Sequence, residues 1–442
     1  MLVNSVNICD GACRMFIIET NKFKFSSLSV LACLDGIKTD VAYESMLLGV
    51  LSRGTDKHRT LSELNRHLDT LYSMTLGTRR HRFCSNHFLS AGIEYLDKRY
   101  TYDNAELEEA GVGVIKELLF EPLLDGNGLF LEAYVESEKQ NLINALNSRK
   151  NNPRAYAASL CKELMSRDEP GFMSVDNTLE RIAGITAASL TDYYRKALSA
   201  CGFICFYVGN APERAIKAVE NMMQSLKHEG RLGKLPAHFT IDPPHIPNGV
   251  TELNVPIEVS QCKLSVGYRT PSVLGSPDAT VEQIYATQVL NEIFGGGASS
   301  KLFLNVREAK GLCYYCGSSY SLYSGALYVN SGIDSADRAL VESEIDAQLE
   351  SIRQGNITEE ELENAKRSLR FSYTQITDNT EALENFYLWR SLFSNTASHT
   401  AVIDGIMRVT AEDVARAAQR VVKCACVCID APVAEGRQDI NE

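Results

Sequence analysis

The sequence predicts an α+β fold built from two copies of one unit of about 200 residues each. Three observations lead to this expectation. Short stretches alternate polar and apolar residues, as half-buried strands do, while longer stretches have helical spacing. Several of these stretches recur in the same order about 225 residues further along the chain. A segment rich in proline and glycine separates the two sets.

The first half supplies most of the element predictions. Leucines at positions 61, 64, 68 and 71 give one helix its apolar face. Thr186 is a suitable N-cap for the helical residues that follow it. The predicted elements are a strand at 22–36, helices at 40–53, 61–72, 103–120, 126–149 and 182–200, and a strand at 202–209.

The second half repeats this order. Residues 185–190 are echoed by residues 409–414, and the strand at 202–209 is echoed by residues 424–429. The helical sequence Glu138-Lys139 is echoed by Ala365-Lys366. Because the spacing between copies is nearly constant, the chain is best explained as a duplicated α+β unit.

Residues 228–250 contain four prolines and three glycines, which is typical of a linker. The predicted organisation is therefore an N-terminal domain at 1–227, a linker at 228–250 and a C-terminal domain at 251–442. The length is sufficient for two sizeable cores.

Composition excludes several classes of function. A formal net charge of -12 argues against a general binder of nucleic acid or of anionic membranes. The apolar fraction of 45% and the charged fraction of 23% are those of a globular protein. The first residues lack a basic region followed by an apolar core, and no apolar run approaches the roughly 18 residues of a membrane span. We expect a cytoplasmic protein that binds neither membrane nor nucleic acid.

Thirteen cysteines are expected to remain reduced in such a protein. Cys424, Cys426 and Cys428 alternate, which predicts that they share one face of a strand. Cys313 and Cys316 form a single CxxC without a second pair or nearby histidines to complete a zinc site. Core packing is the favoured interpretation of all five.

The segment 294–315 combines three consecutive glycines, Gly295, Gly296 and Gly297, with Arg307 and Tyr314. A guanidinium can hold a carbonyl or carboxylate through two parallel hydrogen bonds, and a phenol can donate to a developing oxyanion. The structural alternative is that Arg307 ends a helix, Tyr314 begins a strand and the glycines form a helix cap and loop.

The segment resembles the substrate-binding segment in the second domain of zinc peptidases of the M16 (pitrilysin/insulinase) family. The duplicated α+β unit with long helices and a proline-rich linker resembles that family's single-chain layout as well. The resemblance implies a clam-shell of two homologous αβ domains. It also implies that Arg307 and Tyr314 bind a peptide or unfolded polypeptide substrate, with the glycines allowing its backbone to approach closely.

The resemblance also identifies what is absent. Active members carry His-x-x-Glu-His on a helix, with the glutamate activating water and a further glutamate ligand on a later helix. Here the sequence that follows this motif is legible as Val50-Leu-Ser-Arg-Gly-Thr55. Counting back from it places Ser45, Leu48 and Gly49 at the motif positions. The later helix carries Asn144 and Ala145 where paired glutamates are expected. We expect no catalytic zinc, and no other cofactor, in this chain.

Other catalytic or metal-binding patterns are not convincing. His81 and His87 flank Cys84, but a strand would place residues 81 and 84 on opposite faces, so we interpret this stretch as a surface strand edge. No Gly-x-Ser-x-Gly elbow occurs, and no Gly-Lys-Ser/Thr follows the glycine triplet as a phosphate loop requires.

Within the family, the chain particularly resembles zinc-lacking members of Gram-positive bacteria that accompany an active M16 partner and are associated with the 5-aminopentanol modification of elongation factor P. Residues 52–55, 68–72, 134–142 and 294–315 carry this resemblance. The expected function is a non-catalytic, substrate-presenting subunit of a heterodimeric endopeptidase whose partner holds the zinc. The alternative is a structural or assembly homologue with no role in proteolysis. The missing ligands make an independent protease the weakest hypothesis.

Overall fold

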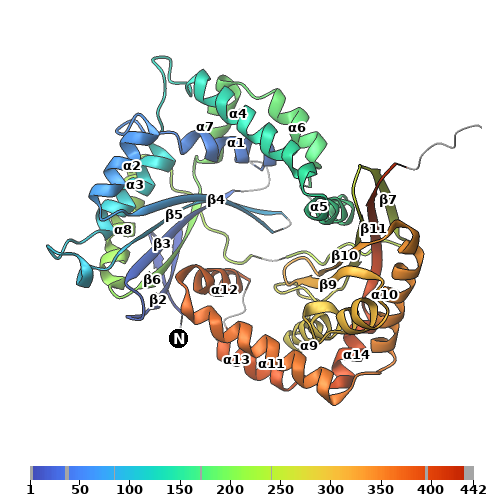
Figure 1. The fold of residues 1–442 in the computed structure, drawn as a ribbon. Coiled ribbons are helices and arrows are strands. Elements are labelled where there is room, and N and C mark those ends of the chain that lie inside the picture. The colour runs from blue at the N-terminus through green and yellow to red at the C-terminus, as the bar shows by residue number, and fades with distance from the viewer. Residues whose placement is uncertain are drawn as a thin grey trace, which may run out of the picture. The chain divides into compact units, whose positions relative to one another are not determined.

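The computed structural model describes residues 3–34, 39–83, 85–169, 172–239, 241–393 and 397–432. The chain forms two compact units, each with its own sheet (Figure 1). Unit 1 comprises Met1–Asn147, Pro170–Ile241 and Thr374–His399. Unit 2 comprises Ser148–Glu169, Asp242–Tyr373 and Thr400–Glu442.

Unit 1 contains a six-stranded mixed sheet in the order β1-β2-β6-β3-β5-β4. β2 and β6 pair in parallel, and the other neighbours are antiparallel. β4 is an edge strand, as predicted around His81, whereas His87 is buried on the inner strand β5, contrary to the predicted surface position. The strands are β1 (Asn4–Ile8), β2 (Cys13–Glu19), β3 (Phe25–Leu34), β4 (Thr75–Phe83), β5 (Asn86–Leu96) and β6 (Gly202–Gly209).

Helices cover both faces of this sheet. Leu28 and Val30 of β3 belong to the core formed with α3 and α8, while Ser29 between them meets α12 on the other face (Figure 1). The helices of unit 1 are α1 (Val41–Leu51), α2 (Leu61–Thr70), α3 (Glu108–Phe120), α4 (Glu132–Asn147), α6 (Val175–Ala183), α7 (Ala187–Ala197), α8 (Pro212–His228) and α12 (Thr380–Leu392).

Unit 2 contains a five-stranded sheet in the order β7-β11-β8-β10-β9. This order matches β2-β6-β3-β5-β4 of unit 1 strand for strand. Within these two sets of five strands, β2 and β6 are parallel, as are β7 and β11, and the other neighbours are antiparallel. The match confirms the predicted duplication and the α+β class. The strands are β7 (Thr251–Pro256), β8 (Cys262–Arg269), β9 (Cys313–Ser321), β10 (Ala326–Ile333) and β11 (Val422–Asp430).

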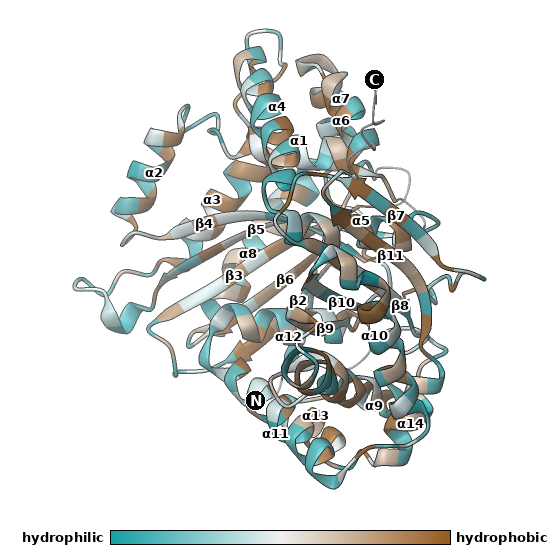
Figure 2. Cartoon of the chain, turned by 45° about the vertical axis from the view of Figure 1, so that its right-hand side comes forward, coloured by the Kyte–Doolittle hydropathy of each residue, from teal (hydrophilic) through white to brown (hydrophobic). Residues whose placement is uncertain are grey.

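In unit 2, α5 packs against β8 and β11, where Ala157 and Cys161 join a core with Val427 and Ile429. Figure 2 shows β11 as mainly hydrophobic, in keeping with its burial. The α-helices of unit 2 are α5 (Pro153–Ser166), α9 (Val281–Asn291), α10 (Arg338–Arg353), α11 (Glu359–Gln375), α13 (His399–Met407) and α14 (Ala411–Gln419).

Local details of the repeat are also confirmed. Thr186 caps α7 and Thr410 caps α14, each through a reciprocal capping box. The echoed lysines, Lys139 on α4 and Lys366 on α11, are both buried and each pairs with a glutamate three residues earlier. The duplication therefore extends from topology to single contacts.

Three details differ from the sequence-based expectations. The single helix predicted at 182–200 is two helices, because α6 ends at Ala183 and Gly184 caps it. Cys424 does not share a face with Cys426 and Cys428, since a β-bulge after Lys423 turns it toward the α5 side. The boundary between the two compact units falls at Ile241, within the predicted linker. However, the α5 segment belongs to unit 2 although it precedes the linker, and the α12 segment belongs to unit 1 although it follows the linker.

Candidate functional site

The candidate substrate segment, residues 294–315, lies between α9 and the edge strand β9 of unit 2 and includes the first residues of that strand. Thr280 caps α9, which continues into the short π-helix η3 (Glu292–Gly296). After a loop, the chain forms a second π-helix, η4 (Leu302–Ala309). Gly311 ends η4 with φ of +64°, a conformation that favours glycine. The chain then enters β9 at Cys313.

Arg307 lies in the last turn of η4 and is partly exposed. Its guanidinium carbon lies 4.7 Å from the centre of the Phe303 ring. Its Nε lies 3.6 Å from Oε1 of Glu308, the one acidic group that the described residues place within ion-pair distance of Arg307. Because that carboxylate is itself 54% exposed, most of the hydrogen-bonding capacity of Arg307 is available to a ligand.

Tyr314 is the extra residue of a β-bulge. Cys313 pairs with Ile333 and Tyr315 with Gly332, which leaves Tyr314 without a partner opposite it in β10. Its side chain is 54% exposed, and its hydroxyl donates a long hydrogen bond of 3.3 Å to Oδ1 of Asp334. The bulge therefore directs a phenol outward at the start of an edge strand.

The three glycines have different surroundings. A Cβ on Gly295 would lie 2.5 Å from the backbone nitrogen of Ser318, so this glycine allows η3 to pack against β9. A Cβ on Gly296 would meet only the flexible Glu292 carboxylate, and one on Gly297 would meet nothing within 4 Å. Gly295 thus has a structural role, whereas Gly297 is open to an approaching chain.

Cys313, the residue before Tyr314, feels the charge of Arg307, which the sequence does not reveal. A hydrogen bond from Cys316, helped by one from Ser331 and by the nearby charge of Arg307, lowers the pKa of Cys313 to about 7 despite burial of the thiol. The bulge at Tyr314 turns both cysteines inward. No signal in the sequence reveals this, because the bulge breaks the usual alternation.

The degenerate metal positions lie on α1, which packs against α4. The Ser45 hydroxyl donates to the Val41 carbonyl oxygen at 2.8 Å, and Leu48 is buried. A Cβ on Gly49 would lie 2.9 Å from Oε2 of Glu138 on α4. The helix that carries the motif positions therefore faces the predicted partner helix, with small or apolar residues at the contact.

An ion pair occupies this contact instead of a set of metal donors. Arg53, one turn after Gly49, pairs with the Glu138 carboxylate through Nε and Nη2, and Nη2 also donates to the Ser137 hydroxyl at 3.0 Å. Asn144, further along α4, is exposed. Both Arg53 and Glu138 stood in stretches used for the family resemblance, but their pairing depends on how the helices pack.

The histidines of the β4–β5 hairpin do not converge. His81 bonds to the Ser90 hydroxyl at 3.2 Å, and burial lowers its pKa to about 4. His87 bonds to the Glu44 carboxylate at 2.8 Å in the core. Cys84 lies outside the described residues.

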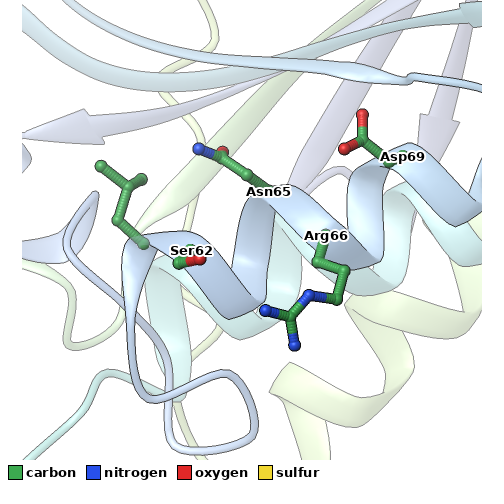
Figure 3. Close-up of a pocket in the computed structure, with 5 residues that line it drawn as sticks. Ser62, Asn65, Arg66 and Asp69 are labelled. Carbon is green, nitrogen blue, oxygen red and sulfur yellow. The ribbon is translucent and has the colours of Figure 1, made fainter.

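An open pocket follows the exposed face of α2 in unit 1. Ser62, Asn65, Arg66 and Asp69 all project from this one helix, with Leu61 at its N-terminal end (Figure 3). Groups from a single helix do not converge on a reacting atom as a catalytic site requires.

Within the described ranges, no helix is long and apolar enough to cross a membrane.

Known proteins are similar to this chain in sequence and in fold. The family model described as Peptidase M16 inactive domain matches residues 184–369. The probable inactive metalloprotease YmfF of Bacillus subtilis is 27% identical over 425 residues, which cover 95% of this chain and 96% of that protein.

Two solved structures match nearly end to end. A conserved protein from Enterococcus faecalis matches with a TM-score of 0.86 at 25% identity, covering 99% of this chain and all of that one. A peptidase M16 inactive domain from Pseudomonas fluorescens matches with a TM-score of 0.77 at 18% identity and the same coverage. The chain is therefore similar in sequence and in fold to members of the M16 peptidase family, including members described as inactive.

Proposed function

We propose that the chain is a non-catalytic, substrate-presenting subunit of a heterodimeric M16 zinc endopeptidase. The observation that carries this proposal is the presence of a partly exposed Arg307 at the end of η4 and an exposed Tyr314 at the start of β9, in a chain whose motif positions are Ser45, Leu48 and Gly49. A chain that served only as a scaffold would have no need of an outward phenol and an under-paired guanidinium at this place.

The chemistry divides between the two subunits. The partner would supply zinc, the activated water and the glutamate base. Arg307 would hold a carbonyl or carboxylate of the peptide through parallel N–H donors. Tyr314 would donate its O–H to the oxyanion that forms when water attacks the scissile carbonyl. Gly297 would leave room for the substrate backbone.

We further propose peptide processing as the setting, with proteins of the elongation factor P modification system as the first substrates to test. The resemblance of residues 52–55, 68–72, 134–142 and 294–315 to the zinc-lacking members associated with that system supports this choice. The name printed for the YmfF relative, a probable inactive metalloprotease, supports the non-catalytic role.

The test is peptide hydrolysis by an equimolar mixture of this chain and a zinc-bearing M16 protein from the same genome. Arg307→Ala should lower kcat/KM by about 100-fold, and Tyr314→Phe by about tenfold or more, because each removes a donor to the transition state. Matched controls are Arg408→Ala and Tyr102→Phe, which remove an exposed guanidinium and an exposed hydroxyl elsewhere. Equal hydrolysis with all four variants would establish the structural, assembly-only alternative.

A further inference from the structure

Each sheet contains a pair of buried cysteines on neighbouring strands. In unit 1, Sγ of Cys13 lies 3.7 Å from Sγ of Cys205, and in unit 2 Sγ of Cys262 lies 2.8 Å from Sγ of Cys428. Only the second pair has a carboxylate beside it: one donor atom from each of Cys262, Cys428 and Asp430 lies within 4.8 Å of the others. Across the described part of the chain, this is the one group of three such donors.

Strand register brings the three side chains together. Cys428 and Asp430 are two residues apart on β11, so they face the same side of the sheet. Cys428 pairs with Leu264 and Ile429 with Lys263, and the next step of this antiparallel register brings Cys262 opposite Asp430. The cluster therefore has two rigid strands as its scaffold.

We propose that Cys262, Cys428 and Asp430 bind one thiophilic divalent cation of the zinc type. Two thiolates and a carboxylate are ligands that zinc accepts, with Zn–S distances of about 2.3 Å. Tetrahedral geometry then places the two sulfurs about 3.8 Å apart. The sulfurs must separate by about 1 Å, which small side-chain rotations supply. Binding releases the two thiol protons, and the partly buried Asp430 leaves a fourth position for water.

The surroundings orient the carboxylate of such a site. Oδ1 of Asp430 accepts hydrogen bonds from the Ser335 hydroxyl at 2.6 Å and from the Ala431 backbone N–H at 2.8 Å, which leaves Oδ2 for the cation. The three negative ligand charges exceed the two charges of the cation by one, and the positive charge of Arg338 is already paired with the Glu342 carboxylate at 2.8 Å.

The cluster is joined to the candidate substrate segment. Ser335, which binds Asp430, directly follows Asp334, which accepts the hydrogen bond from Tyr314. Cys262, Ile333 and Cys313 also form one row across β8, β10 and β9. A cation bound to Asp430 would thus steady the turn against which Tyr314 rests. This consequence rests on the proposed function, whereas cation binding itself does not.

The experiment is a cadmium titration of the full-length chain, reduced and freed of metal, with the ultraviolet thiolate-to-cadmium absorption and the bound metal as readouts. We expect one cation per chain. Cys428→Ser should abolish the absorption, and Asp430→Asn should weaken binding at least tenfold. Cys205→Ser is the matched control and should change nothing, because the Cys13–Cys205 pair has no carboxylate. Asp430 is less buried than Cys428, so its variant tests the site even if Cys428→Ser folds poorly.

Three results would overturn the proposal. The reduced chain could fail to bind cadmium, or the absorption could persist in Cys428→Ser and disappear in Cys316→Ser, which would assign it to the CxxC formed by Cys313 and Cys316. The chain could also be isolated with a Cys262–Cys428 disulfide and no bound cation, each sulfur having lost a proton and one electron to an oxidant such as a small disulfide. None of these readouts uses peptide cleavage, so they leave the proposed function separately testable.

Discussion

Polar side chains are paired with each other at the contact between α1 and α4 in unit 1. In the η4–β9 segment of unit 2, they are only weakly paired. In unit 1, Arg53 and Glu138 satisfy each other across the helix contact that carries the degenerate motif. In unit 2, Arg307 and Tyr314 are exposed and only weakly paired. Two copies of one fold have thus diverged in residues rather than in architecture, and function must be read from those residues.

The helices that cover the two sheets differ as well. In unit 1, α12 places Glu384 against the Ser29 hydroxyl of β3 at 3.0 Å. In unit 2, α5 presents Ala157, Cys161 and Met165 to its sheet. A titratable group is therefore held against the first sheet by a helix whose counterpart in the second unit is apolar at the sheet contact.

The largest expected effect comes from Glu384. Burial raises its pKa to about 7, above the value of about 4.5 expected when unfolded. The folded chain then binds more protons between these values, so its free energy of unfolding falls as pH rises from about 5 to about 8. We expect a loss of about 2–3 kcal/mol, at about 1.4 kcal/mol per pKa unit. Urea unfolding at the two pH values measures it.

Glu384→Gln should remove most of this pH dependence and stabilise the chain at the higher pH. Glu412→Gln, at an exposed carboxylate on α14, is the control and should retain the wild-type slope. A slope that is the same in all three proteins would show that Glu384 titrates alike in the folded and unfolded states.

The glycine triplet gives the next largest effect. Gly295→Ala should cost about 1–3 kcal/mol, because its Cβ would overlap the backbone nitrogen of Ser318. Gly297→Ala should cost almost nothing, since its Cβ would point into open space and its φ of -162° suits any residue. Chemical denaturation of both variants checks this difference, and equal costs would contradict the separate roles given to the two glycines.

A double-mutant cycle on Arg53 and Glu138 should give a coupling of about 1 kcal/mol, because both side chains are mostly buried. The exposed Lys196–Asp192 pair on α7 provides a comparison and should couple negligibly. Equal coupling in the two pairs would mean that Arg53 and Glu138 do not stabilise the α1–α4 contact beyond an ordinary surface pair.

The smallest effect concerns the candidate substrate residues themselves. Arg307→Ala and Tyr314→Phe should change the free energy of unfolding by less than about 0.5 kcal/mol, since both side chains are exposed and weakly paired. Thermal unfolding of the two variants measures this. A large loss of stability would assign these residues to the structure of unit 2 instead of to substrate.

The sequence predicted the duplication because its signals are local: Thr186 and Thr410 mark helix starts, and short apolar runs mark β6 and β11. It could not show which sheet α5 and α12 would cover, because their apolar faces do not specify a partner. The bulge at Tyr314 and the meeting of Cys262 with Asp430 depend on strand register. Register is set by pairing between distant strands and so leaves no local pattern.

Hydrolysis of one peptide by this chain alone, by a zinc-bearing M16 partner alone and by their mixture tests the central claim most directly. The account predicts cleavage that needs both chains and that a zinc chelator stops. Cleavage by this chain alone, stopped by the same chelator, would contradict it, because Ser45, Leu48 and Gly49 would then belong to a working protease.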